Sequence, residues 1–139
     1  MSRRKGRILA FQALYSWDVG QSPLEDILKF SWLSETAPVE ETAFASLIIS
    51  GTVEHVAEID ELIKKHLSAS WTLERINKVS LAIMRTSIYE MKYQAGSEPK
   101  IVIDEAVNIA REFGLEDSYK FINAVLDKIG KEKKKKNIL

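Results

Sequence analysis

The chain has 139 residues, its 20 lysines and arginines balance its 20 aspartates and glutamates, and hydrophobic residues make up 45% of it. This length and composition supply enough apolar surface for one compact domain, which excludes a disordered polyelectrolyte. The absence of cysteine excludes a disulfide scaffold, a thiolate zinc site and a cysteine nucleophile, and it fits a reducing, cytoplasmic setting.

Apolar residues recur at helical spacing along nearly the whole chain. The first amphipathic stretch follows the basic residues 1–7 and ends at Gly20. The serine and proline at 22–23 cap and open a second helix, which we expect to extend to Leu33. A single long helix is predicted over residues 38–67.

The second half of the chain continues the same pattern. Residues 71–75 are predicted to form a short turn of helix, and residues 76–91 a central helix. A proline opens the next helix, over residues 99–113, and Asp117 or Ser118 caps the last one. No segment reads convincingly as a strand, so we predict an all-α fold of about seven helices in a single domain, residues 1–139.

Two polar residues interrupt the apolar faces of these helices and need partners. Arg85 lies within the central helix, and we expect it to pair with a carboxylate, with Glu105 as the candidate. Asn123 interrupts the stripe of the last helix, where a buried amide would satisfy the backbone of a neighbouring helix.

Positive charge is concentrated at the two ends of the chain, whereas the stretch from residue 8 to residue 66 is acidic. The lysine-rich tail, residues 131–139, is expected to be flexible and mainly solubilising. The basic N-terminal arm, residues 1–7, leads directly into a helical pattern, which places its cations on an ordered element. This arrangement favours contact with a polyanion such as nucleic acid.

No familiar catalytic or metal-binding motif is present. His55 and His66 have no companion ligand at helical spacing, and the glycines are too scattered for a phosphate-binding loop. The adjacent acids Glu40 and Glu41 suit the first turn of a helix better than acid–base catalysis. We therefore predict no enzymatic activity, no metal and no cofactor, and we find no stretch suited to a membrane helix or an export signal.

Four segments, in this order along the chain, carry a resemblance to a known family: Phe11–Trp17, Met84–Met91, Ile103–Val107 and Phe113–Leu126. Each segment alone is a weak pattern, but their order and spacing together are specific. On these residues the chain resembles the transcription antitermination factor NusB family. The resemblance covers nearly the whole sequence.

The resemblance implies an all-helical fold of two small packed bundles and a non-enzymatic role. Members of this family bind the boxA element of nascent RNA together with NusE, a small-subunit ribosomal protein. The pair helps to assemble an RNA polymerase complex that resists termination during ribosomal RNA synthesis. A protein-only helical adaptor, a homodimer, and a domain associated with a ribosomal RNA methyltransferase are the alternatives that the sequence leaves open.

The resemblance also implies an RNA site built from two regions that should adjoin, the start of the first helix and the last loop. Tyr15 and Phe121 fit base stacking and ordinary core packing equally well. The implied RNA-binding residues are Arg3, Arg4, Lys5, Arg7, Tyr15, Glu116, Asp117, Ser118, Lys120 and Phe121.

Two further expectations follow from the same resemblance. Gly6 stands where the family commonly has alanine, so it should weaken the helix and leave the basic arm to order on RNA. The NusE-facing surface is implied to lie away from the RNA site, and the residues implied for it are Glu74, Lys78 and Ser80.

Overall fold

The computed structural model describes residues 3–113, 115 and 117–138, with side chains described as far as residue 132. These residues form α-helices and one 3₁₀ turn, without a strand, which confirms the all-α prediction. The elements are α1 (Arg3–Asp18), α2 (Leu24–Ile27), α3 (Val39–Glu54), α4 (Val56–Lys65), η1 (Leu73–Arg75), α5 (Lys78–Tyr93), α6 (Pro99–Glu112) and α7 (Tyr119–Ile138).

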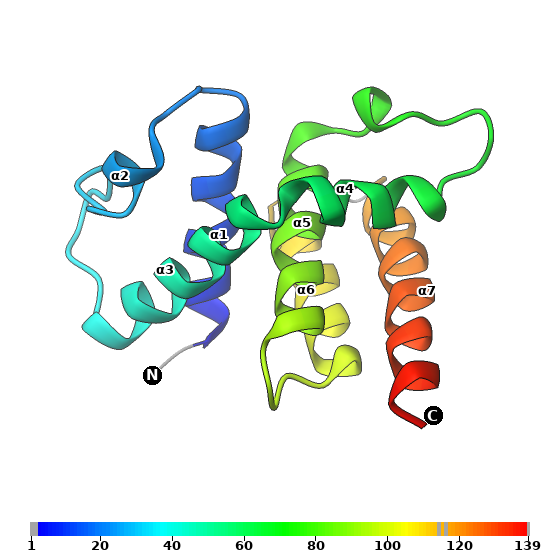
Figure 1. The fold of residues 1–139 in the computed structure, drawn as a ribbon. Coiled ribbons are helices and arrows are strands. Elements are labelled where there is room, and N and C mark those ends of the chain that lie inside the picture. The colour runs from blue at the N-terminus through cyan, green and yellow to red at the C-terminus, as the bar shows by residue number, and fades with distance from the viewer. Residues whose placement is uncertain (1–2, 114, 116, 139) are drawn as a thin grey trace.

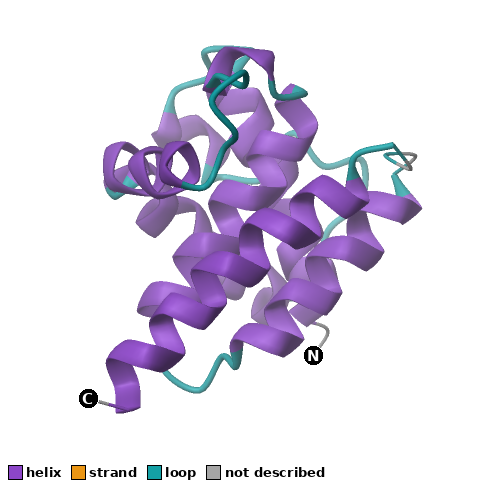
Figure 2. Ribbon diagram, turned by 90° about the vertical axis from the view of Figure 1, so that its right-hand side faces the viewer, coloured by secondary structure: helices purple, strands orange, loops and turns teal. Residues whose placement is uncertain are grey.

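The helices form two groups that meet at α5. Figure 1 shows α1, α2 and α3 on one side and α5, α6 and α7 on the other, with α4 crossing the upper ends of α5 and α7. In the view turned by 90°, the described helices are joined only by loops and turns (Figure 2). The two small packed bundles predicted from the resemblance are therefore present.

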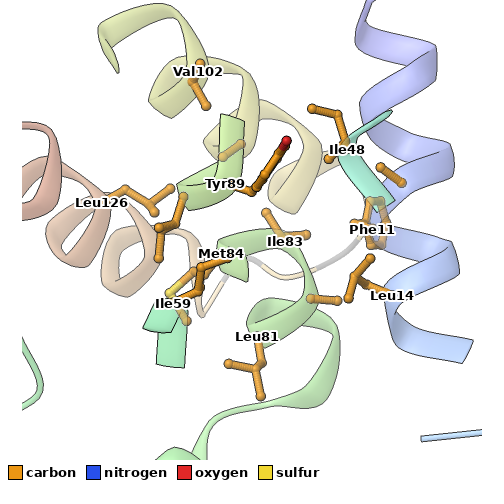
Figure 3. Close-up of a cluster of buried hydrophobic side chains, with 14 of the residues drawn as sticks. Phe11, Leu14, Ile48, Ile59, Leu81, Ile83, Met84, Tyr89, Val102 and Leu126 are labelled. Carbon is orange, nitrogen blue, oxygen red and sulfur yellow. The ribbon is translucent and has the colours of Figure 1, made fainter. Parts of the chain in front are cut away.

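Helix α5 is the centre of the fold. It contacts α1, α3, α4, α6 and α7, and every residue from Ser80 to Met91 is buried. Side chains from the surrounding helices converge on it in one continuous apolar core (Figure 3). The labelled core residues of Figure 3 include Phe11 and Leu14 from α1, Ile48 from α3, Ile59 from α4, Met84 from α5 and Leu126 from α7.

The short turn and the central helix each begin two residues later than predicted, at Leu73 and Lys78, and two other helices differ more. The long helix expected over residues 38–67 is broken at His55, whose backbone (φ −107°, ψ 15°) separates α3 from α4. This break turns α4 across α5. The second helix stops at Ile27 rather than at Leu33, because Phe30 adopts a left-handed backbone (φ 56°) that a right-handed helix cannot contain.

Arg85 pairs with carboxylates, as predicted, but not with Glu105. Its Nε and Nη2 donate to the two carboxylate oxygens of Asp60 at 2.9 and 2.8 Å, and Nη1 lies 3.2 Å from Oδ2 of Asp18. Burial alone would lower the pKa of Arg85, but the hydrogen bonds and charges of the two aspartates raise it overall. The guanidinium therefore stays charged inside the fold and joins α5 to α4 and α1.

Asn123 is exposed on the surface of α7, so the prediction of a buried structural amide is wrong. The buried stripe of this helix consists of Ile122, Val125, Leu126 and Ile129. Asn123 directly follows one member of the stripe and therefore turns away from it, because neighbouring residues on a helix point in different directions.

At Gly51, α3 packs so closely on α5 that there is no room for a larger side chain. A Cβ added there would overlap the ring of Tyr89, whereas one added at Gly130 would lie 3.3 Å from the nearest atoms of Ile103 and Pro99. We expect Gly51→Ala to lower the free energy of unfolding by about 1–3 kcal/mol through overpacking. Gly130→Ala should be nearly neutral, because improved helix propensity of about 1 kcal/mol offsets the tighter contact. Urea denaturation followed by circular dichroism measures both, and equal midpoints would contradict this account.

Candidate nucleic-acid interface

The basic start of the chain is already helical, since α1 begins at Arg3. The expectation that this arm orders only on RNA is therefore wrong. Gly6 explains the difference, because it is buried against α3 and a Cβ there would lie 2.7 Å from Cδ2 of Phe44 and 3.3 Å from the carbonyl oxygen of Glu41. The glycine lets α1 approach α3 closely, and this packing offsets its low helix propensity.

Arg7 anchors the start of α1 to the central helix. Its Nε and Nη2 donate to the two carboxylate oxygens of Glu90 at 2.8 and 2.7 Å, and Glu90 also accepts from the Ser97 hydroxyl at 3.0 Å. The side chain of Arg7 is 14% exposed and that of Glu90 is 2% exposed, and the hydrogen bonds to Glu90 raise the pKa of Arg7. Arg7 therefore positions the arm, and most of its side chain is withdrawn from solvent.

The other three cations of the arm lie in different environments. Arg3 is exposed, and its guanidinium carbon sits 4.9 Å from the centre of the Phe44 ring. Lys5 is also exposed. Arg4 is half-exposed, and its Nη2 donates to Glu112 at 2.6 Å, a bond that raises its pKa.

The end of α6 lies against α1. Besides the bond to Glu112, Arg4 contacts Glu105 of α6 at 3.5 Å. Phe11 and Phe113 pack edge to face, with ring centroids 5.1 Å apart and an interplanar angle of 82°. The segment leading into the last loop therefore lies against α1, whereas the adjacency of residues 117–121 to the basic arm stays a prediction.

The two candidate stacking residues are placed differently. Tyr15 is 38% exposed on α1 and its ring is accessible from solvent. Phe121 is half-buried at the start of α7, and its ring centroid lies 5.9 Å from that of Trp71, for which no role was predicted from the sequence. Trp71 lies in a loop between α4 and η1, where no periodicity signals a role.

The remaining implied RNA-binding residues surround the start of α7. Asp117 and Lys120 are exposed, and Ser118, half-buried, precedes the first helical residue and accepts a bond from the backbone of Ile122 at 2.9 Å. Nearby, the guanidinium of Arg111 lies 5.1 Å from the centre of the Tyr119 ring. Glu116 lies outside the described residues.

The implied partner-binding residues do not all reach the surface. Glu74 and Lys78 are exposed near the start of α5, but Ser80 is 1% exposed, so its assignment to an interface is wrong. Asn77 caps this helix, since its Oδ1 accepts from the backbone of Val79 and Ser80 at 2.9 and 3.1 Å. Ser80 is buried because the surrounding helices cover α5 from this residue to Met91.

Among the described residues, no group of three His, Asp or Glu side chains lies close enough to hold a metal ion. Nor does that part of the chain contain a helix long and apolar enough to cross a membrane. The candidate interface consists of cations and aromatic rings around the start of α1 and the end of α6.

The buried and exposed ion pairs of the arm should contribute very differently to stability. We expect Arg7→Gln to lower the free energy of unfolding by about 3 kcal/mol or more, because it leaves the buried Glu90 carboxylate without its cation. The matched variant Arg4→Gln breaks an exposed pair and should cost less than about 1 kcal/mol. Urea midpoints compare the two variants, and an Arg7→Gln midpoint equal to that of Arg4→Gln would show that the Glu90 pair does not hold α1 in place.

Comparisons with known proteins show which family the chain resembles. The sequence model of the NusB family matches residues 4–131. The transcription antitermination protein NusB of Treponema denticola is 49% identical over 131 residues, which cover 93% of this chain and 96% of the relative. The NusB of Borreliella burgdorferi is 41% identical over 126 residues, covering 87% and 88%.

Solved structures show the same similarity in three dimensions. T. maritima NusB superposes with a TM-score of 0.85 at 34% identity, over 95% of this chain and 92% of that one. A structure of the antitermination factors NusB and NusE in complex with dsRNA superposes with a TM-score of 0.77 at 26% identity, over 94% and 96%.

Proposed function

The chain belongs to the NusB family, and from this membership we propose that it is a transcription antitermination factor that binds boxA RNA together with NusE. The observation that carries the RNA-binding role is the fixed basic face at the start of α1, with Arg3 and Lys5 turned to solvent. The relatives are antitermination proteins, and a related NusB is seen with NusE and dsRNA. The proposed role is binding and assembly, without catalysis.

The solvent-accessible cations of the arm bind the RNA backbone, whereas Arg7 positions them. Arg3 and Lys5 stand on a helix whose position is set by the buried Arg7–Glu90 pair, so little ordering cost remains to be met on binding. Arg4 joins them by exchanging Glu112 for a phosphate. This exchange costs little free energy, because an exposed ion pair contributes only about 0–1 kcal/mol to stability. Each phosphate contact releases condensed counterions and makes binding salt-dependent.

Aromatic and polar side chains read the single strand. Unpaired bases present faces for stacking and edges for hydrogen bonding, and the exposed ring of Tyr15 is suited to the first of these. Ser118 and Lys120 supply a hydroxyl and a cation at the start of α7. Asp117 is also exposed there and opposes nearby phosphate, which limits the affinity for RNA that lacks a matching donor.

NusE is proposed to bind near the start of α5, away from the basic arm of α1. Glu74 and Lys78 are the exposed candidates there, and because Ser80 is buried these two are the implied partner-binding residues that remain accessible. Through NusE, the chain is proposed to join an RNA polymerase complex that resists termination.

Replacing Arg3 and Lys5 together by glutamine tests the electrostatic part of this proposal. We expect weaker binding to boxA and to unrelated single strands alike, and a slope of log affinity against log salt that is flatter by about 1.4, or about 0.7 per lost phosphate contact. The control is Lys29→Gln, which removes an exposed lysine beside α2 that pairs with Asp26. Fluorescence anisotropy at several salt concentrations measures the slopes. An unchanged slope in the double variant would show that the arm does not contact phosphate.

The sequence-specific part of the proposal is tested with three RNAs: single-stranded boxA, a scrambled strand of equal composition, and a boxA duplex. We expect the chain to prefer single-stranded boxA over the scrambled strand, and NusE to increase this preference. The measurement with the boxA duplex shows whether the chain also binds double-stranded RNA, which is present in the related complex. Equal weak binding to all three RNAs, unaffected by NusE, would favour a protein-only adaptor.

A further inference from the structure

An exposed tryptophan rests on the start of α7 without contributing much to the core. Trp71 is 45% exposed, and its ring lies 5.9 Å from that of Phe121 at a tilt of 34°. Phe121 packs against the apolar core, and its neighbour Ile122 is fully buried. The aromatic pair therefore has a rigid inner ring and an accessible outer ring.

Hydrogen bonds within the loop hold Trp71 in this position. The backbone N–H of Trp71 donates to the carbonyl oxygen of Ser68 at 3.0 Å. The guanidinium of Arg75 donates through Nη1 to the carbonyl oxygen of Ser70 at 2.9 Å. The bond to Ser70 holds the exposed guanidinium of Arg75 close to Trp71, the next residue in the chain.

The charges around this aromatic pair favour an anionic ligand. Lys120 is exposed next to Phe121, Arg75 is exposed next to the loop, and Lys78 is exposed at the start of α5. Among the described residues, the acids beside these cations are Glu74, which is exposed, and Asp117, which precedes α7. The pKa of Glu74 is lowered chiefly by a hydrogen bond from its own backbone and also by one from Thr72, so this carboxyl group stays ionised. An anionic ligand is therefore favoured only because the three cations outnumber these two acids.

We propose that Trp71, backed by Phe121, is a stacking site for an unpaired RNA base, with Arg75 and Lys120 placed to meet the flanking phosphates. This inference rests on the proposed RNA-binding function and extends its surface from α1 to the loop between α4 and α5. An indole face accepts any base, because every base has a π-face, so the site adds affinity with little sequence preference. A protein partner would use an exposed tryptophan as well, but the flanking cations favour RNA.

The first test compares Trp71→Ala and Trp71→Phe for binding of single-stranded boxA RNA in the absence of NusE. We expect Trp71→Ala to weaken binding roughly tenfold with an unchanged salt slope, since a stack and no phosphate contact is lost. Trp71→Phe should retain most of the affinity. Trp32→Ala is the matched control, because Trp32 is 41% exposed in the loop that follows α2, and it should bind RNA as the wild type does.

The second test observes Trp71 directly and does not depend on how Trp71→Ala folds. Trp71 is one of three tryptophans, so replacing Trp17 and Trp32 by phenylalanine leaves it as the sole indole fluorophore. We expect boxA RNA that carries 2-aminopurine to quench this fluorescence on binding, with reciprocal quenching of the 2-aminopurine.

Three outcomes would overturn the inference. Wild-type affinity of Trp71→Ala together with unquenched Trp71 fluorescence would show that no base stacks there, while the proposed function would stand. Weakened binding to NusE with unchanged RNA affinity would assign Trp71 to the protein-binding surface. Absence of RNA binding by the wild-type chain would remove the proposed function and this inference together.

Discussion

The burial of Glu90 on the central helix is the constraint on which the geometry of the RNA-binding face depends. Its carboxylate is 2% exposed on a helix that contacts α1, α3, α4, α6 and α7, so an uncompensated charge there would destabilise the whole molecule. Arg7 supplies the compensating charge through two parallel hydrogen bonds. Because Arg7 belongs to the first turns of α1, the same contact that neutralises the core also fixes the direction in which Arg3 and Lys5 point.

A second buried charge completes the attachment of α1 to α5. Arg85 is held by Asp60 of α4 and by Asp18, the last residue of α1. Helix α1 is thus joined to α5 by ion pairs near both of its ends, with the apolar contacts of Phe11 and Leu14 between them. Ion pairs of this kind add little net stability over apolar packing, but they penalise any other register of the two helices. The basic face is therefore presented in one orientation.

The sequence predicted the helices and the need for charge compensation better than it predicted the particular partners. Periodicity located the helices, and Arg85 within an apolar stripe correctly required a carboxylate. Arg85 meets Asp60 because the break at His55 turns α4 across α5. This break could not be predicted, since no proline or glycine stands at that position. Ser80 and Asn123 were misplaced because the exposed or buried side of a position depends on how the helix is rotated within the bundle, and neighbouring positions differ by about 100°. Trp71 was missed because it lies in a loop, where periodicity carries no information.

The four cations of the arm are chemically alike but not equivalent as ligands for phosphate. Arg7 uses the Nε–Nη2 edge of its guanidinium on Glu90 and is mostly withdrawn from solvent, and Arg4 must first leave Glu112. Arg3 is held differently, over the face of Phe44. Stacking on an aromatic ring engages the flat face of a guanidinium and leaves the N–H donors in its plane available to an oxyanion. Phe44 therefore orders Arg3 without consuming its hydrogen-bonding capacity, and the close approach of α1 to α3 that Gly6 permits is what brings the two side chains together.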